Sequence, residues 1–367
     1  MIHVFVGTNA QLIKMAPIVR ELDALGIAYN FIDAGQHIEN TEEFVSVFGL
    51  RNPDVSLRSG HHNITTVPQS VRWFLQSLWM WLFGKSKIRS EVFRGQGGIC
   101  LVHGDTLTTL ISTLFAKRAG IAVAHVEAGL RSHDLLHPFP EEMIRIIVMR
   151  LSDVLFAPGE QSYRNLVAMK VRGQLVNTQA NTVVDAVSYI SGRASVELQK
   201  LPERYVVVSV HRAEMVFSAR RLELLLDTLV TLPTDLTILF VIHAVTLKQL
   251  KAFGMYERLQ KMPNVRILPP QNYADFHALL QRAQFLVTDG GSIQEESGIL
   301  NIPCLILRKK TEREIGPNAM LSQYNLDRIR YFVEHYQEFR GAVEGIDHSP
   351  SRQIVEFVRK WEETHPA

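Results

Sequence analysis

The sequence has few of the features that mark secreted or nucleic-acid-binding proteins. Its 367 residues include only two cysteines, Cys100 and Cys304. Each lies in an apolar stretch typical of a buried strand, so the sequence indicates no disulfide framework. The formal net charge is only +2. A dedicated nucleic-acid binder usually has a strongly basic domain, so we expect no nucleic-acid partner.

The chain also shows no targeting signal, repeat or low-complexity segment. It begins Met1-Ile-His-Val-Phe-Val6 and enters an apolar strand directly, without the basic region and small-residue cleavage site of a signal peptide. We therefore expect a cytoplasmic protein. Glycine and proline are spread along the chain, and no internal repeat is visible in residue matches.

The residues that are present form a globular α/β pattern. Hydrophobic residues make up 46% and charged residues 21% of the chain, which is ample apolar content for two cores. A length of 367 residues suits two domains of about 170 residues each. Short apolar strands alternate with helical patterns from the strand 2–6 onward, and the alternation starts again at the strand 205–210. We place the hinge between about 172 and 185.

Carboxylates follow successive strands in the first half. Asp105 comes after the predicted strand 98–102, and Glu127 comes after the strand 121–124. The carboxyl ends of parallel strands point into the ligand crevice, so both carboxylates should face the same opening. Glu141 and Glu142 then open a predicted helix, 140–151.

Each of these carboxylates alone has a plainer explanation. A lone Asp after a strand is usually a helix cap, and Glu141 and Glu142 suit the positive end of the helix dipole. Several carboxylates after successive strands are nevertheless costly to crowd together, because like charges raise each other's pKa. Sites that carry this cost often perform proton transfer.

Two glycine turns indicate phosphate binding. Gly7-Thr8-Asn9 follows the first strand, and Gly290-Gly-Ser292 follows the predicted strand 285–289. Free N–H groups at a helix start attract anions, so each turn is suited to a phosphate or diphosphate.

Taken together, the motifs resemble the signature blocks of the UDP-N-acetylglucosamine 2-epimerase family. The similarity runs in order from Gly7 to about Arg313. The blocks are His103-Gly-Asp-Thr106, His125-Val-Glu-Ala-Gly-Leu-Arg131, Pro138-Phe-Pro-Glu-Glu142 with Arg145, and Asp289-Gly-Gly-Ser-Ile-Gln-Glu-Glu296.

The resemblance implies the glycosyltransferase-B type of α/β fold, in which two Rossmann-like parallel-sheet domains face a central cleft. It implies an N-terminal domain over 1–175 that carries the catalytic carboxylates and a UDP-binding domain over 176–345. A C-terminal helix within 346–367 would cross back to the first domain.

The activity that the resemblance implies is interconversion of UDP-GlcNAc and UDP-ManNAc, for the synthesis of surface polysaccharide precursors. UDP is eliminated and then re-added to the other face of the sugar, with no metal and no other cofactor. The implied partner is a UDP-sugar substrate. Most members of the family are homodimers, so a homodimer is expected.

The resemblance also implies roles residue by residue. Asp105, Glu127 and Glu141 would relay protons, and His211 would stabilise charge on the leaving diphosphate. For Arg131, substrate contact and a structural salt bridge both stay open. In the family, the counterpart of Phe276 packs on uracil and that of Glu296 binds the ribose hydroxyls. The residues implied in substrate and UDP binding are Lys14, Arg145, Arg212, Phe276, Gly291, Ser292, Glu296 and Arg313.

The chain departs from the family pattern at two places, and these keep rival functions open. Asn9 stands where the family has an arginine, and the order Gly290-Gly-Ser292 replaces Ser-Gly-Gly. The main rival is a glycosyltransferase that passes a sugar from UDP to a membrane or glycan acceptor. A hydrolysing epimerase and a catalytically silent nucleotide-sugar sensor are the others.

The segment from Trp73 to Arg94 is the least family-like. Its apolar run is much shorter than the roughly 20 residues that cross a bilayer. We consider two interpretations: a helix packed in the core or at a subunit interface, and a peripheral contact with the inner face of the membrane. The first is favoured, because aromatic stripes at helical spacing usually pack inside. The residues behind both interpretations are Trp73, Trp79 and Trp81, then Lys85, Lys87, Arg89 and Arg94, with Glu91 as the only acid that follows.

Overall fold

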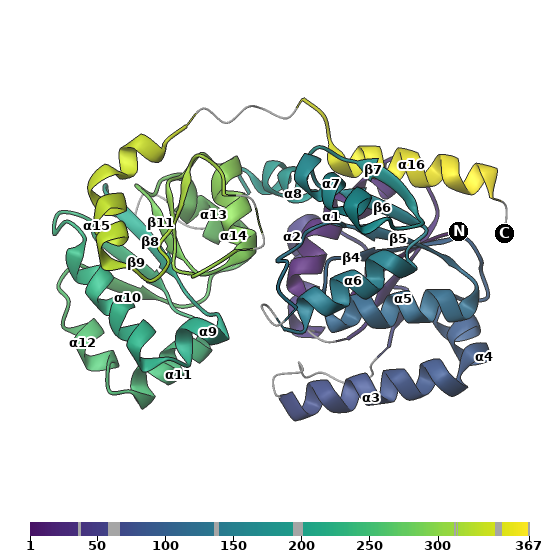
Figure 1. Cartoon of the computed structure of the whole chain (residues 1–367), viewed down its shortest axis with the longest axis horizontal. Helices are drawn as coiled ribbons and strands as arrows, with labels where there is room; N and C mark the ends of the chain where they lie inside the picture. The colour runs from purple at the N-terminus through teal and green to yellow at the C-terminus, as the bar shows by residue number, and fades with distance from the viewer. Residues whose placement is uncertain are drawn as a thin grey trace. The chain divides into compact units, whose positions relative to one another are not determined.

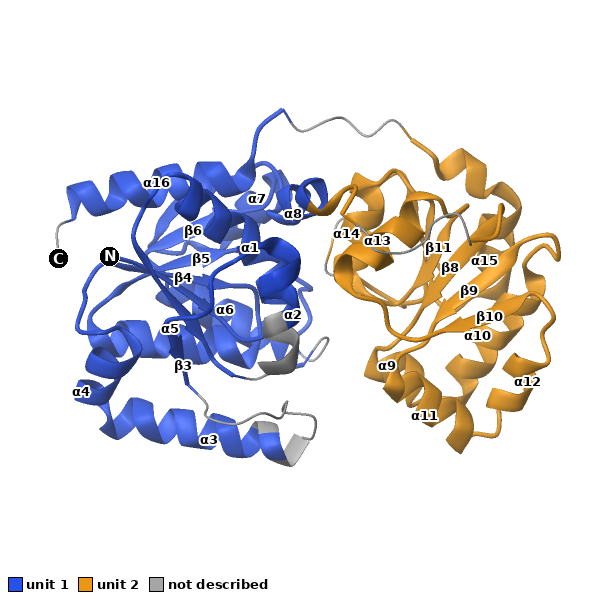
Figure 2. Ribbon diagram, turned by 180° about the vertical axis from the view of Figure 1, so that it is seen from behind, with its two compact units in different colours: residues 1–189, 346–367 blue, residues 190–345 orange. Residues whose placement is uncertain are grey.

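A computed structural model of the chain describes residues 1–35, 38–57, 67–135, 139–193, 201–311, 313, 315–341 and 347–365. The helices and strands along the chain are labelled in Figure 1. They form two compact units, drawn in different colours in Figure 2. The first unit holds Met1–Tyr189 and Ile346–Ala367, and the second holds Ile190–Gly345.

The first unit is built on a parallel sheet in which the described strands have the order β3-β2-β1-β4-β5-β6-β7. The strands are β1 (Ile2–Val6), β2 (Tyr29–Asp33), β3 (Val55–Ser56), β4 (Ile99–His103), β5 (Ala122–Val126), β6 (Val154–Ala157) and β7 (Gln174–Asn177). Every residue of β1, β2 and β4 is buried. This is expected of parallel strands that helices cover on both faces.

The helices of this unit pack in two groups. Helix α1 contacts both α2 and α16, and α5 contacts both α3 and α6; Figure 1 shows the strands between the groups. The helical segments are α1 (Asn9–Ala24), α2 (Ile38–Phe48), α3 (Val67–Phe83), α4 (Lys85–Lys87), a π-helical turn (Ile88–Val92), α5 (Leu107–Ala119), α6 (Glu141–Leu151), α7 (Glu160–Met169), α8 (Val183–Ile190) and α16 (Pro350–Thr364).

The second unit repeats the plan, and its described strands have the order β10-β9-β8-β11-β12-β13, all parallel. The strands are β8 (Tyr205–Ser209), β9 (Thr237–Val241), β10 (Val265–Leu268), β11 (Leu286–Thr288), β12 (Cys304–Ile306) and β13 (Ala319–Leu321). The helices are α9 (Ala213–Val216), α10 (Ala219–Thr231), α11 (Ala244–Ala252), α12 (Tyr256–Gln260), α13 (Tyr273–Gln281), α14 (Gly291–Ile299), α15 (Leu326–His335) and a 3-10 turn (Tyr336–Phe339).

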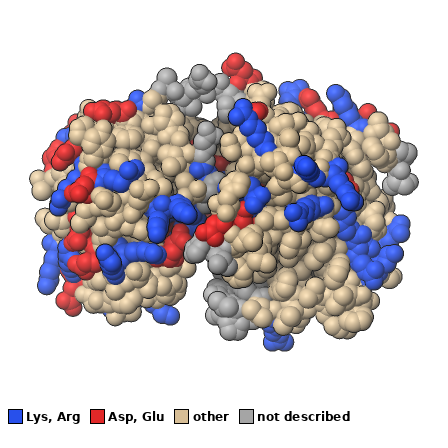
Figure 3. Space-filling model, viewed as in Figure 1, with Lys and Arg blue, Asp and Glu red and all other residues tan. Residues whose placement is uncertain are grey.

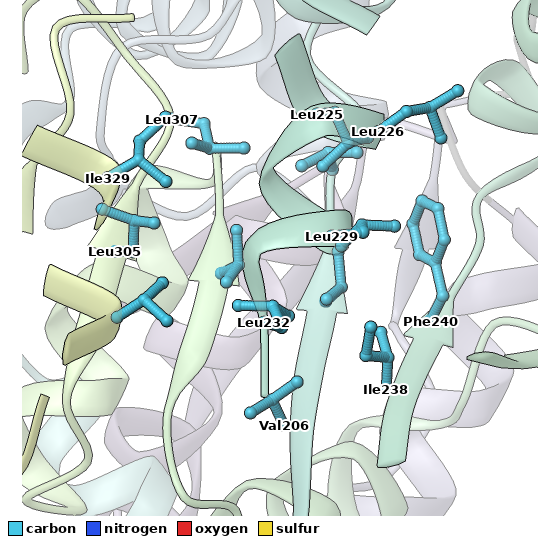
Figure 4. Packing of buried hydrophobic residues seen from close by; sticks show 14 of the residues in the cluster. Val206, Leu225, Leu226, Leu229, Leu232, Ile238, Phe240, Leu305, Leu307 and Ile329 are labelled. Carbon is cyan, nitrogen blue, oxygen red and sulfur yellow. The ribbon is translucent and has the colours of Figure 1, made fainter. Parts of the chain in front are cut away.

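Two apolar cores cover the two faces of the second sheet. Alternate residues of a strand point to opposite faces, so Val206 joins one core and Val207 the other. The first core packs against α10 and α15; Figure 4 shows Leu229 of α10 and Ile329 of α15 on the same side as Ile238. The second core includes Leu279 and Leu280 of α13.

The strand orders locate the candidate ligand sites. In each sheet the chain runs outward in one direction and then restarts beside the first strand, between β1 and β4 and between β8 and β11. Ligands of open α/β sheets bind at the carboxyl ends of the strands at such a switch point. The segments at these places are Gly7-Thr8, Gly104-Asp105, His211-Arg212 and Asp289-Gly290.

Two boundaries differ from the sequence predictions. The first unit runs through Tyr189 rather than ending near 175, because β7 completes its sheet and α8 follows. The second is the start of a helical segment that the sequence predicts from Glu334 to about Arg340. Residues 334–339 are helical, but α15 begins earlier, at Leu326, because the Asn325 side chain accepts hydrogen bonds from the N–H groups of Asp327 and Arg328.

Helix α3 has one buried face and one exposed face. Trp73 is 8% exposed and lies in the core that includes Phe115 of α5. Trp79, in contrast, is 66% exposed. The prediction of core packing is therefore confirmed for Trp73, whereas Trp79 does not lie in the core. No helix in the described ranges is both long enough and apolar enough to cross a membrane. Figure 3 shows acidic and basic side chains interspersed on the face drawn.

This orientation of α3 is tested by a matched pair of substitutions. We expect Trp73→Ala to lower the free energy of unfolding by about 3–5 kcal/mol, because it leaves a cavity in the core. Trp79→Ala should change it by less than about 0.5 kcal/mol, since a surface change removes few contacts. Guanidinium denaturation followed by circular dichroism measures both. An equal loss in the two variants would show that α3 does not face the core as described.

Candidate functional site

Glu127 is the most constrained carboxylate in the first unit. It follows β5 and has a φ of 65°, in the left-handed region that non-glycine residues rarely adopt. Its side chain is buried. Lys14 forms an ion pair with its Oε2 atom, and Asn181 donates its side-chain N–H to the same oxygen. His103 Nε2 lies 3.8 Å from that oxygen. A strained backbone held by buried partners is a feature that clusters at active sites.

Lys14 reaches Glu127 because α1 is tied to the turn after β4. The side chains of Thr8 and Gln11 form a capping box at the start of α1. The Gln11 amide also donates to the His103 carbonyl oxygen at 2.8 Å and to Thr109 Oγ1 at 2.9 Å. These bonds connect the two loops at the β1–β4 switch point, and Lys14 is almost completely buried between them.

A second set of ion pairs surrounds Asp105. Arg145 of α6 pairs with Asp105 and also lies 3.2 Å from Glu142 Oε2. Arg131 Nε donates to Glu142 Oε1 at 2.5 Å. Arg131 is therefore in a structural salt bridge, one of the two roles that the sequence left open. The fully buried Glu142 belongs to this network.

Glu141 and Glu142 differ in their hydrogen-bond partners. Burial raises the pKa of Glu142, but hydrogen bonds from Arg131, the Ser132 amide and Arg145 outweigh it and hold the pKa below its usual range. Glu142 is thus an ionised structural group. In the described part of the chain, the Oε2 atom of Glu141 is buried and has no hydrogen-bond partner. Of this pair, Glu141 is the one with an acceptor left for a ligand.

His125 is a structural residue rather than a proton carrier. It is buried in β5, and its Nε2 lies 2.7 Å from the Gly104 carbonyl oxygen. Burial lowers its pKa to about 4, so the ring is neutral near pH 7. Its contact holds the turn before Asp105 against β5.

In the second unit, Asp289 organises the switch point. Its fully buried carboxylate accepts the backbone N–H of His211 at 3.0 Å and that of Arg212 at 2.9 Å. Burial nevertheless raises its pKa. The His211 ring lies 4.7 Å from that of His243. Partial desolvation and the Arg212 cation lower the pKa of His211, so it is a neutral hydrogen-bonding group near pH 7.

The glycine turn after β11 leads directly into α14. Gly290 is the N-cap residue, and Gly291 and Ser292 form the first turn. A Cβ atom at Gly290 would lie 3.4 Å from the His211 ring, which is ordinary van der Waals distance, so the two loops lie side by side at this point. The helix start therefore presents N–H groups beside His211, an arrangement suited to a phosphate.

The remaining predicted residues of the second unit lie on α13, α14 and the loop after β12. Glu296 is buried, and its Oε2 lies 2.8 Å from His277 Nε2. Phe276 is partly buried against the apolar core, and Ser292 is partly exposed. Arg212 lies 3.1 Å from Glu214, and Arg313 pairs with Glu295.

The sequence predicted no part in these sites for Asn181 or His277. Glu142 and Asp289 lie in the quoted motifs but were not among the predicted catalytic or binding residues. Asn181 is 54 positions away from its partner Glu127, so no local pattern connects them. Among the described residues, no three His, Cys, Asp or Glu side chains gather as a metal site requires.

These features define a class: an α/β protein of two doubly wound units, each with charged side chains and helix starts at its switch point. A family model described as UDP-N-acetylglucosamine 2-epimerase matches residues 20–345. The chain belongs to the UDP-N-acetylglucosamine 2-epimerase family. It is 32% identical over 351 residues to the UDP-N-acetylglucosamine 2-epimerase of Methanocaldococcus jannaschii, covering 91% of each chain.

Solved structures agree with this assignment. The M. jannaschii UDP-GlcNAc 2-epimerase in complex with UDP-GlcNAc and UDP is 28% identical, with a TM-score of 0.83 over 98% of this chain and 99% of that one. The Neisseria meningitidis UDP-GlcNAc 2-epimerase bound to UDP-GlcNAc is 25% identical, with a TM-score of 0.81 and the same coverage. The predicted family and the predicted two-domain fold are confirmed.

The role of Glu142 is tested by its pH dependence. Removal of one partner from a buried ion pair is strongly destabilising, so Glu142→Gln should lower the free energy of unfolding by about 3 kcal/mol near pH 7. A carboxyl group whose pKa is lower in the folded state than in the unfolded state stabilises the fold at pH values above the unfolded-state pKa. This stabilisation is lost as the pH falls through the folded-state pKa. The difference between wild type and variant should therefore shrink below about pH 4.5.

The neighbouring Glu141→Gln is the control for this measurement. Urea denaturation at a series of pH values should show a much smaller loss in that variant, because Glu141 Oε2 has no partner in the described chain. A loss for Glu142→Gln that stays constant with pH would contradict the structural role.

Proposed function

We propose that this protein is a UDP-GlcNAc 2-epimerase that interconverts UDP-GlcNAc and UDP-ManNAc for the synthesis of surface polysaccharide precursors. The observation that carries the proposal is the arrangement of Asp105, Glu127 and Glu141 in the first unit, in which Glu127 is buried against Lys14 on a strained backbone. The relatives' complexes with UDP-GlcNAc support the substrate class.

The chemistry explains why several carboxyl groups are needed. The hydrogen on C2 of the sugar is barely acidic, and the departure of UDP makes its removal feasible. One carboxylate takes the C2 proton, a C1–C2 double bond forms, and the C1–O bond breaks with its electron pair on UDP. The product is a 2-acetamidoglucal. Re-addition returns a proton to the opposite face of C2, and UDP rejoins C1.

Epimerisation needs a proton-transferring group on each face of C2. A proton leaves one face and another arrives at the opposite face, so two different groups serve the two steps, and Asp105, Glu127 and Glu141 supply them. Lys14 pairs with Glu127 and Arg145 pairs with Asp105, so each of these two carboxylates has a cation beside it.

The second unit binds UDP in this proposal. His211, Arg212 and the start of α14 with Gly291 and Ser292 stabilise the diphosphate as charge grows on it. Phe276 packs on uracil, and Glu296 accepts hydrogen bonds from the ribose hydroxyls. Arg313, beside Glu295, adds positive charge near the nucleotide.

Asn9 replaces a guanidinium of the family with a neutral amide. It begins α1, and its Oδ1 atom is buried without a hydrogen-bond partner in the described chain. It contributes a hydrogen-bonding group rather than a charge, and the cations that pair with Glu127 and Asp105 are Lys14 and Arg145. The retained carboxylates favour epimerisation over glycosyl transfer, which needs fewer acids.

The proposal predicts deuterium at C2. With UDP-GlcNAc in D2O, the wild-type protein should yield UDP-ManNAc and exchange the C2 hydrogen, followed by NMR. We expect Glu127→Gln to lower kcat about 100-fold to 10,000-fold, the usual range for a positioned acid or base. Its affinity for UDP should not change, because Glu127 lies in the first unit. Calorimetry with UDP serves as the folding control.

Other products would point to the rival functions. Free N-acetylmannosamine with UDP, and no UDP-ManNAc, would indicate a hydrolysing epimerase. UDP binding without any exchange would overturn the epimerase, and release of UDP only on addition of a glycan or lipid acceptor would then indicate a transferase.

We also propose that the exposed face of α3 contacts an anionic membrane surface. Leu75, Trp79 and Phe83 are each more than half exposed, and α3 contains no acidic residue. Arg72 within α3 and Lys85, Lys87 and Arg89 directly after it are exposed, with Glu91 as the one acid in that stretch. The exposed Arg118 donates to the carbonyl oxygens of Trp81 and Leu82 at the end of α3. Apolar contact with the lipid boundary plus attraction of basic side chains to anionic headgroups is the usual mode of peripheral binding. Two copies pairing through this face would bring the cations together, which opposes dimerisation there.

Vesicle flotation tests the membrane contact. Wild type should float with phosphatidylglycerol vesicles but not with phosphatidylcholine vesicles, and salt should weaken the binding. Trp79→Ala combined with Phe83→Ala should abolish flotation, whereas Tyr331→Ala, an exposed aromatic of the second unit, should not. Light scattering of the same samples measures the predicted homodimer. A wild type that stays in solution, with a molar mass halved by the double variant, would assign the face to a second copy.

A further inference from the structure

The segment Asn181-Thr-Val-Val-Asp185 contains a polar side chain that connects a helix start to the candidate active site. Asn181 precedes α8 and is buried. Its Oδ1 accepts the Val183 N–H at 3.3 Å and lies 3.5 Å from Thr182 Oγ1. An asparagine side chain that accepts the N–H two residues later forms an Asx turn, a common device at helix starts.

The Asx turn decides which end of the Asn181 amide faces Glu127. Because Oδ1 is directed to the Val183 N–H, the NH2 group points the other way, and it donates to Glu127 Oε2. A flipped amide would present an oxygen to a carboxylate and lose both hydrogen bonds. The polarity of Asn181 is therefore set by the backbone of α8.

Helix α8 is itself held firmly in the first unit. Asp185 Oδ2 accepts the Ser351 N–H at 2.8 Å, which joins α8 to the start of α16. Arg20 of α1 lies over the Tyr189 ring at 3.7 Å. Lys14 is also on α1, so the two groups that contact Glu127 Oε2 come from helices that are tied to each other.

We propose that Asn181 is a positioning residue, which holds the Glu127 carboxylate in its reactive orientation and favours its ionised form. This inference rests on the proposed function, in which Glu127 transfers a proton. A hydrogen bond to the charged form of a carboxyl favours that form. Lys14 places a positive charge beside Glu127. Asn181 adds a hydrogen-bond donor of fixed direction, because its amide group is planar whereas an ammonium group is not.

Two substitutions separate the donor from the Asx turn. Asn181→Asp keeps the shape and an acceptor for the Val183 N–H but replaces the donor with a carboxylate. Asn181→Ser keeps a capping hydroxyl but is too short to reach Glu127 as well. We expect kcat for epimerisation to fall at least tenfold in both, with KM for UDP-GlcNAc nearly unchanged. The acidic limb of the pH profile of kcat/KM should move to higher pH, by about one unit in Asn181→Ser.

The matched control is Asp185→Ala. It removes the bond between α8 and α16 without touching Glu127. It should lower thermal stability but leave the pH profile in place. If Asp185→Ala shifts the acidic limb as much as Asn181→Ser does, Asn181 acts only through the stability of α8 and the inference is wrong.

Carbon-13 NMR of glutamate-labelled protein makes the inference testable even without turnover. The Glu127 carboxyl signal is assigned by its loss in Glu127→Gln. Its titration midpoint should be higher in Asn181→Ser than in wild type. An unchanged midpoint in Asn181→Ser overturns the inference about Asn181. If the midpoint is higher in Asn181→Ser as expected but the wild-type protein does not epimerise UDP-GlcNAc, only the proposed function is overturned.

Discussion

The buried contact between Lys14 and Glu127 is the interaction on which the first unit depends. Two charges removed from water are stable only when each has the other, and loss of one partner costs several kcal/mol. Lys14 and Glu127 both have almost no exposed side-chain surface. Helix α1 and the turn after β5 must therefore stay in register, and the capping box of α1 with the Gln11 bridge to the β4 turn maintains that register.

In the second unit a buried carboxylate also has partners, but these are backbone N–H groups. Asp289 is more deeply buried than Glu127 and accepts hydrogen bonds from backbone N–H groups, whereas Glu127 pairs with the Lys14 cation. Burial raises its pKa, whereas the ion pairs of the first unit keep Glu142 ionised. In the first unit the Gln11 amide joins the two loops at the switch point, and Glu127 joins α1 to the turn after β5. In the second unit Asp289 joins the two loops at the switch point and holds a turn suited to an anion.

Individual residues show how far sequence reasoning could go. Asp105, Glu127 and Glu141 were found because each follows a strand or starts a helix, which is local information. The local pattern did not distinguish Glu141 from Glu142, and only the family resemblance indicated Glu141. The structural difference between them depends on Arg131 and Arg145, which both pair with Glu142. In the tryptophan segment, Trp73 lies in the core and Trp79 does not, because the tertiary contacts of α3 decide which face is covered.

The sequence by itself determined the alternation of strands and helices, the family, and the carboxylates and glycine turns of the two switch points. These follow from hydrophobic periodicity and from side-chain chemistry at strand ends, which act over a few residues. The tertiary structure alone decided which cation pairs with which carboxylate, and that Asn181 reaches Glu127. Such contacts join positions far apart in the chain, and they form because buried charges and amides must find partners wherever the packed helices place them.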